Sequence, residues 1–259
     1  LTLKTELPTP KYEDLVRRGQ FYDRVLTAVR ALPGVESAAF ITALPMVLTG
    51  GITFVEVPGH VKSDTWNGGV SHRFITPQFF RTMRIPVLRG RDVEDADTVN
   101  RTWVAVVSES FVKRNWPGGE PLGKTFTHRG HQRTIVGVVG DIRVRGLERT
   151  SEPQIYLPAA QFPADALSLN YEPKDLVIRH AGQPAPLMSA IREIVHAADP
   201  EQPISDVRAL DDIVAGETAP RRAQLRVLGT LAIIALLLSG VGIHGLLAYT
   251  VSQRSQEIG

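Results

Sequence analysis

The stretch VLGTLAIIALLLSGVGIHGLLAYTV, residues 227–251, decides how this chain is organised. It contains no Asp, Glu, Lys or Arg, and its one ionisable side chain is that of His244. A bilayer core about 30 Å thick is crossed by about 20 apolar residues in a helix. The sequence therefore predicts a transmembrane helix over Val227–Val251. The stretch is not a signal peptide, because it lies at the wrong end of the chain.

The residues before Gln224 have the mixed composition of a water-soluble domain. The formal net charge of the 259-residue chain is +2, and Lys and Arg are not clustered, which argues against nucleic acid as a partner. Cysteine is absent. This excludes a disulfide framework, a cysteine-ligated zinc site and a thiol nucleophile.

Helices and strands are predicted in irregular alternation. The apolar spacing of Phe21, Val25 and Val29 predicts a helix over Tyr12–Leu32, which Pro33-Gly34 ends. No regular βαβ repeat follows. The fold class is therefore expected to be α+β rather than a doubly wound sheet.

Two helix starts and one hairpin are predicted from local signals. Thr76 and Ser108 are expected to be N-caps, the first before a short helix that begins at Pro77 and the second before Glu109–Trp116. Strands at Lys124–Thr127 and Thr134–Val139 are expected to pair across a polar turn over His128–Gln132.

Six short phrases follow one another through the middle of the chain: TPQFF (Thr76–Phe80), IPVLRGR (Ile85–Arg91), VAVVSE (Val104–Glu109), WPGGEPLGK (Trp116–Lys124), IVGVVGD (Ile135–Asp141) and PQIYLP (Pro153–Pro158). This succession resembles the extracytoplasmic core domain of MacB-type ABC transporter permeases. The apolar stretch, followed by Arg254 and then Glu257-Ile258-Gly259, resembles the start of an FtsX-like permease domain. Near the N-terminus, LPGV (Leu32–Val35) and ALP (Ala43–Pro45) resemble the branch in which one polypeptide carries two permease halves.

The resemblance implies a division of the chain into parts. Residues 1–72 and 166–209 would form a discontinuous porter-like subdomain, and residues 73–165 a small inserted α/β subdomain. Residues 210–226 would form a stalk helix before the membrane helix at 227–251. Residues 252–259 would begin the cytoplasmic coupling segment, in which Arg254, Glu257, Ile258 and Gly259 would meet the ATPase.

Partners and function also come from the resemblance. It implies a separate ABC ATPase, a second permease half or protomer, further periplasmic partner proteins, and a place in the bacterial inner membrane with the soluble domain outside the cytoplasm. The chain would transmit ATP-driven conformational change, for efflux or mechanotransmission, without being an enzyme and without a cofactor. No G-x-x-x-x-G-K-[ST] phosphate loop occurs in the sequence. The alternative is a membrane-anchored extracytoplasmic sensor or scaffold module that works without an ATPase.

Chemical sites are not predicted in the soluble part. His128 and His131 have a spacing that could chelate a metal on a helix, but here they belong to the predicted turn, beside Arg129 and Arg133, and cations oppose metal binding. We expect this turn to be a solvated hairpin turn. His60 and His72 are expected to lie at the surface. Ser108 is interpreted as a helix cap rather than a nucleophile, because no base or oxyanion site accompanies it.

Within the apolar stretch, Ser239, Gly242 and Gly245 recur at three-residue spacing and predict close packing against another helix. His244 is an ionisable group at membrane depth, which is a functional hypothesis. A hydrogen bond from a neutral imidazole to a neighbouring helix is the simpler interpretation.

The charges around the stretch conflict with the resemblance. Arg221, Arg222 and Arg226 precede it and Arg254 follows it. The count alone would place the soluble domain in the cytoplasm. We follow the resemblance, because long domains translocate largely regardless of charge.

Overall fold

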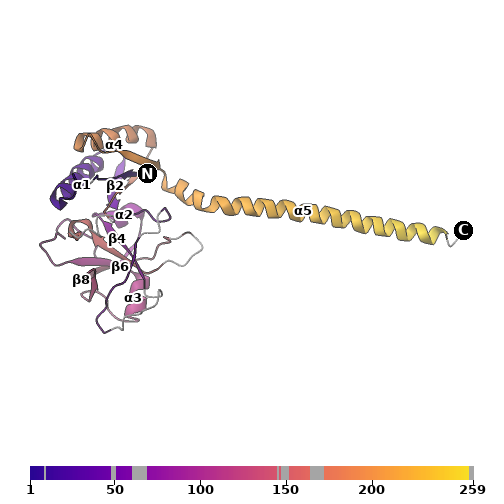
Figure 1. Ribbon diagram of the computed structural model, residues 1–259, viewed down its shortest axis with the longest axis horizontal. Coiled ribbons are helices and arrows are strands. Elements are labelled where there is room, and N and C mark those ends of the chain that lie inside the picture. Colours follow the sequence, from indigo (N-terminus) through magenta and orange to yellow (C-terminus); the bar gives the residue numbers. More distant parts are fainter. Residues whose placement is uncertain are drawn as a thin grey trace. The chain divides into compact units, whose positions relative to one another are not determined.

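The computed structural model describes residues 1–8, 10–47, 51–59, 69–144, 146, 152–163 and 172–256. Contacts divide the chain into two compact units, Leu1–Ile213 and Val214–Gly259. The first unit holds a sheet with helices on it, and the second is a continuation of one helix (Figure 1).

The helices and strands alternate without a fixed period, as expected for the α+β class. In chain order they are β1 (Thr2–Thr5), α1 (Leu15–Arg30), β2 (Val35–Ile41), β3 (Gly51–Thr53), β4 (Val70–Ile75), α2 (Phe79–Met83), β5 (Val87–Gly90), β6 (Val104–Ser108), α3 (Glu109–Asn115), β7 (Thr125–His128), β8 (His131–Val139), β9 (Gln154–Pro158), the 3-10 helix η2 (Ala159–Gln161), β10 (Asp175–His180), α4 (Pro184–Ala198), β11 (Ile204–Arg208) and α5 (Leu210–Gln256).

Eleven strands within the described residues form one mixed sheet. Nine of them follow the order β11-β1-β10-β2-β4-β9-β6-β8-β5, while β3 pairs with β4 and β7 with β8. The β4–β9 and β6–β8 pairs are parallel, and the others are antiparallel. Strands from residues 1–72 and 166–209 thus occupy one half of the sheet and those from 73–165 the other, with β4 at the boundary. The division into two subdomains stays a prediction, since contacts group residues 1–213 as one unit.

The two halves meet at β2 and β4, where one residue pair, Ile41 opposite Ile75, forms the ladder. Threonine hydroxyls replace backbone groups on either side of this pair. The amide of Phe40 donates to Thr76 Oγ1 at 2.8 Å, and the amide of Phe74 donates to Thr42 Oγ1 at 2.9 Å. Thr76 is therefore not the predicted helix cap, because its hydroxyl is used between strands. Gln78, with a left-handed backbone, precedes α2 instead.

Three apolar clusters form the core of the first unit. In one, α1 and α4 lie side by side over β1, β2 and β10, with Phe21, Val25 and Ile191 fully buried (Figure 1). In the second, Phe79 and Phe80 of α2 pack against residues from both halves of the sheet, among them Ile41 and Tyr156. The third lies under α3 in the other half.

The predicted helix over Tyr12–Leu32 is present but shorter, as α1 over Leu15–Arg30, and its ends have local causes. Asp14 begins α1 by accepting from the amide of Val16 at 2.8 Å, and Gly34 has a positive φ after the helix ends. Ser108 caps α3, as predicted. Strand β1 was not predicted, because its partners β10 and β11 lie about 170–200 residues away in sequence.

The helix predicted from Leu210 onward is continuous from Leu210 to Gln256, 47 residues. At 1.5 Å per residue its length is about 70 Å. Its first turn belongs to the first unit, where Ile213 is 7% exposed within the second apolar cluster. One continuous helix therefore begins in the folded domain and includes the apolar stretch.

Candidate functional site

A cavity of about 400 Å³ lies in the first unit, with α1 on one side and three loop segments on the other. These segments are Thr76–Pro77 after β4, residues 93–98 between β5 and β6, and residues 158–162 at the end of β9. Its apolar lining comes from Leu15, Tyr22, Leu26, Pro77, Val93, Pro158, Ala159, Ala160 and Phe162. A volume of this size is typical of small-molecule sites.

The α1 wall is fixed by Arg18, whose residue is 3% exposed. Its Nε and Nη2 donate to the carbonyl oxygen of Tyr12 at 3.1 and 2.6 Å, and Nη2 lies 3.4 Å from Glu172 Oε2. The guanidinium also lies 5.2 Å from the ring centroid of Phe162. Arg18 therefore ties α1 to the opposite wall. Its Nη1 has no hydrogen-bond partner in the described part of the chain.

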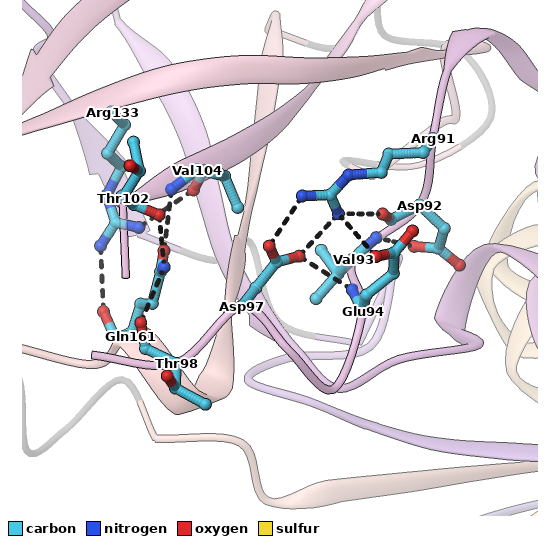
Figure 2. Close-up of polar contacts among 10 residues, drawn as sticks. All are labelled: Arg91, Asp92, Val93, Glu94, Asp97, Thr98, Thr102, Val104, Arg133 and Gln161. Atoms are coloured by element: carbon cyan, nitrogen blue, oxygen red, sulfur yellow. Dashed lines mark hydrogen bonds and ion pairs between the residues drawn. The ribbon is translucent and has the colours of Figure 1, made fainter. Parts of the chain in front are cut away.

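The loop on the other side is held by Asp97, which is 5% exposed. Arg91 donates to both oxygens of Asp97, at 2.8 and 2.7 Å, and the amide of Glu94 donates to Oδ2 at 2.9 Å (Figure 2). Burial raises the pKa of Asp97, but the Arg91 guanidinium outweighs it and the net pKa is lowered. The loop is thus closed by a bidentate ion pair.

Gln161 fixes the following part of the same loop. Its side-chain amide donates to the carbonyl oxygens of Thr98 and Thr102 at 3.2 and 2.9 Å, and its Oε1 accepts from the amide of Val104 at 2.8 Å (Figure 2). Arg133 donates to the carbonyl oxygen of Gln161 at 3.1 Å, and burial lowers the pKa of Arg133 to about 9. The loop at 93–98 is therefore held by the Asp97 contacts and, at Thr98, by Gln161.

Carboxylates lie at the mouth of the cavity. Asp23, Glu94 and Asp95 are lining residues, and Arg30 lies among them. Burial and the charge of Asp95 raise the pKa of Asp23. Arg30 interacts electrostatically with both Asp23 and Asp95, while its Nη2 donates to the carbonyl oxygens of Ala38 and Pro77 at 2.8 Å. The cavity thus combines an apolar interior with an acidic rim.

The histidines lie differently from the prediction. The β7–β8 turn has two residues, Arg129 and Gly130, both with positive φ, so His128 belongs to a strand. His128 and His72 are 0% and 1% exposed, and their ring centroids are 5.1 Å apart. The expected surface positions are therefore wrong for His72 and for His128. His60 lies outside the described residues.

His128 and His131 are opposite each other across the turn, but their rings have different surroundings. His131 stacks on Trp103 at 4.0 Å between ring centroids, while His128 turns into the core. Burial, followed by the charges of nearby arginines, lowers the pKa of His72 to about 4; burial and His72 lower that of His128 to about 2. In the described ranges no group of three or more His, Asp or Glu side chains could hold a metal.

The residues predicted for helix packing lie on α5. Ser239, Gly242 and His244 are exposed on this helix. Residues two apart differ by about 200° around a helix, so His244 lies on the side opposite Gly242. Gly245 and Arg254 lie in α5, and Glu257, Ile258 and Gly259 lie outside the described residues. Packing and coupling stay predictions for this set.

The helix is long and apolar enough to cross a bilayer. Gln224–His244 has a mean hydropathy of 2.1 over its most apolar window, and none of that window is buried within the structure. An unburied apolar helix of 21 residues fits a membrane span by length and composition. The predicted span at Val227–Val251 overlaps this segment.

Comparison with known proteins decides the family. The model of the MacB-like periplasmic core domain matches residues 8–209. The chain belongs to the MacB-like periplasmic core domain family. This match covers β2 to β11 and both walls of the cavity, and it ends one residue before α5 begins.

Individual relatives agree with this family. The "uncharacterized ABC transporter permease YknZ" of Bacillus subtilis is 22% identical over 71% of the chain and 46% of its own length. The "macrolide export ATP-binding/permease protein MacB 2" of Aeromonas hydrophila is 22% identical over 82% of the chain and 33% of its own length. The chain therefore spans half or less of the length of these relatives.

Solved structures of the MacB-like family share the fold. The periplasmic region of MacB from Actinobacillus actinomycetemcomitans superposes with a TM-score of 0.52 at 14% identity, covering 79% of this chain and 87% of that one. The extracellular domain of YknZ, described as a noncanonic ABC-type transporter, gives 0.50 at 13% identity, over 80% and 100%. The α+β class and the resemblance to MacB-type permeases are thereby confirmed.

Proposed function

We propose that this chain is the extracytoplasmic domain and the following membrane helix of an ABC transporter permease subunit, and that it transmits ATP-driven conformational change across the membrane. The observation that carries the proposal is the unbroken helix α5. It begins at Leu210, two residues after β11 ends, and its first turn is buried in the sheet domain at Ile213. A continuous helix provides a path along which a displacement of the membrane segment would reach the domain.

The proposal has defined partners and a defined location. An ABC ATPase would bind on the cytoplasmic side, near Arg254 and residues 257–259. A second permease half or protomer would pack against Ser239, Gly242 and Gly245, and periplasmic proteins would bind the sheet domain. The inner membrane of a bacterium would hold the assembly. In this role the chain performs no catalysis itself.

The test compares two insertions after Arg222 in the full-length permease, assembled with its ATPase. Four alanines keep the helix, lengthen it by about 6 Å and rotate the parts by about 40°. Four glycines add the same length, but each costs up to about 1 kcal/mol of helix stability relative to alanine. We expect the glycine insertion to abolish transport coupled to ATP hydrolysis and the alanine insertion to retain most of it.

Both proteins should assemble to the wild-type level, which membrane fractionation and co-purification with the ATPase would check. Undiminished coupling in the glycine variant would exclude α5 as the transmission path. A tethered sensor or scaffold on a passive anchor would then be the better description.

A further inference from the structure

One wall of the cavity beside α1 contains a glycine that the fold does not require. Gly19 lies in the middle of α1 and lines the cavity. A Cβ atom added at Gly19 would meet no other atom within 4 Å. Glycine is the least favoured residue in a helix interior apart from proline, and neither packing nor backbone conformation demands it at this position. Its consequence is that the cavity stays open on the α1 side.

The charged side chains around this opening favour a cationic ligand. Arg18 also lines the cavity, and Glu172, 3.4 Å from it, offsets its charge. Asp23 on α1 and Asp95 on the facing loop interact with one arginine, Arg30, which leaves one negative charge in excess. Glu94 lies 3.8 Å from Arg91, but Asp97 already pairs with that guanidinium, so Glu94 adds to the negative charge. The repulsion between the two aspartates is consistent with the raised pKa of Asp23. Both aspartates line the cavity, so a cation bound there would relieve that repulsion.

The apolar interior of the cavity favours a ligand whose uncharged part is apolar. Leu26, Val93 and Phe162 present apolar surface, and the loop wall is held rigid by the Asp97 and Gln161 contacts. A preformed apolar cavity binds without a cost for ordering its walls. From the open wall at Gly19, the apolar interior and the paired aspartates, we propose that this cavity is a binding site for a small organic cation, an amine or quaternary ammonium on a compact apolar body.

Three probes of one shape test the proposal: 1-naphthylmethylamine, which is cationic at pH 7.5, the neutral 1-naphthylmethanol and the anionic 1-naphthoate. Equilibrium dialysis would measure their binding to the full chain in lipid nanodiscs, with empty nanodiscs subtracted. We expect the amine to bind most tightly and the carboxylate most weakly. Equal binding of all three, or no binding above empty nanodiscs, would overturn the proposal.

Variants place the binding in the cavity. Gly19→Leu fills the opening from α1, and we expect it to weaken amine binding at least tenfold, while Gly19→Ala leaves room for the probe and serves as its control. Ala160→Phe, from the opposite wall, is a second blocking change. Asp23→Asn combined with Asp95→Asn should weaken the amine about tenfold and leave the alcohol unchanged.

Retained amine binding in both blocking variants would refute the site. An equal loss for amine and alcohol in the double Asn variant would refute the charge selection. Because these are equilibrium binding measurements, they are independent of ATP-driven transport, and their outcome is distinct from that of the insertion experiment.

Discussion

The close approach of β5 and β8 makes Gly137 sensitive to a single added methyl group. Gly137 pairs with Gly90 across the two strands. A Cβ atom on Gly137 would lie under 3.0 Å from the carbonyl oxygen of Arg91, which is backbone and cannot rotate away. Gly137→Ala must therefore push β5 off β8.

The size of the effect follows from what that displacement breaks. Overpacking in a fixed site costs about 1–3 kcal/mol or more. The hydrogen bond from the amide of Arg91 to the carbonyl oxygen of Val136, 3.0 Å long, is lost with it, and each such bond contributes about 0.5–1.5 kcal/mol. We expect a destabilisation of about 1.5–4.5 kcal/mol. For a domain of this size that lowers Tm by about 3–18 °C.

The matched control is the same chemical change at Gly19, where a Cβ atom meets nothing. Gly19→Ala should stabilise α1 by about 0.5–1 kcal/mol, because alanine is the better helix former. Thermal unfolding of both variants, followed through the fluorescence of Trp103 and Trp116, would measure the two shifts. Equal shifts of the same sign would show that local space is not what distinguishes the two glycines, and the described β5–β8 packing would be refuted.

Three further outcomes are expected. Asp97→Ala removes the acceptor for Arg91 and for the amide of Glu94, and should lower the free energy of unfolding by about 2 kcal/mol in the same thermal assay. An unchanged Tm would mean that these hydrogen bonds do not contribute to stability. The lowered pKa of His128 means that the unfolded chain binds a proton below about pH 6.5 while the folded chain does not. Between pH 7.5 and pH 5 the wild type should therefore lose about 2 kcal/mol more than His128→Phe, a comparison that cancels the carboxyl groups; parallel pH curves would contradict the burial of this ring. Since the chain has no cysteine, Lys113→Cys should react with an impermeant thiol reagent in intact cells; labelling only after lysis would place the domain in the cytoplasm.

Features encoded locally could be predicted from the sequence. The apolar face of α1, the cap at Ser108 and the long helix from Leu210 each depend on residues close together in the chain. Strand β1 escaped prediction because its pairing with β10 and β11 is non-local. The burial of His128 escaped because the turn was predicted to be five residues long, whereas Arg129-Gly130 closes it in two.

The cavity could not be predicted, because its walls come from segments up to about 150 residues apart. The one local signal was Gly19, a glycine inside an otherwise regular amphipathic helix. The hydrogen bonds of Asp97 and Gln161 likewise depend on tertiary contacts. Asp and Gln are common at protein surfaces, so the sequence does not mark these two residues as structural.

The junction of β2 and β4 has an elastic consequence. The β2–β4 ladder has one residue pair, Ile41–Ile75, whereas the neighbouring β2–β10 ladder has six, so fewer strand-to-strand bonds resist bending along this line. We expect bending modes of the domain to concentrate along this line, and faster hydrogen exchange at the Phe40 and Phe74 amides than in β10 would report it. Thr76 also lines the cavity. We therefore expect the width of the cavity near Thr76 to change when the sheet bends along this line.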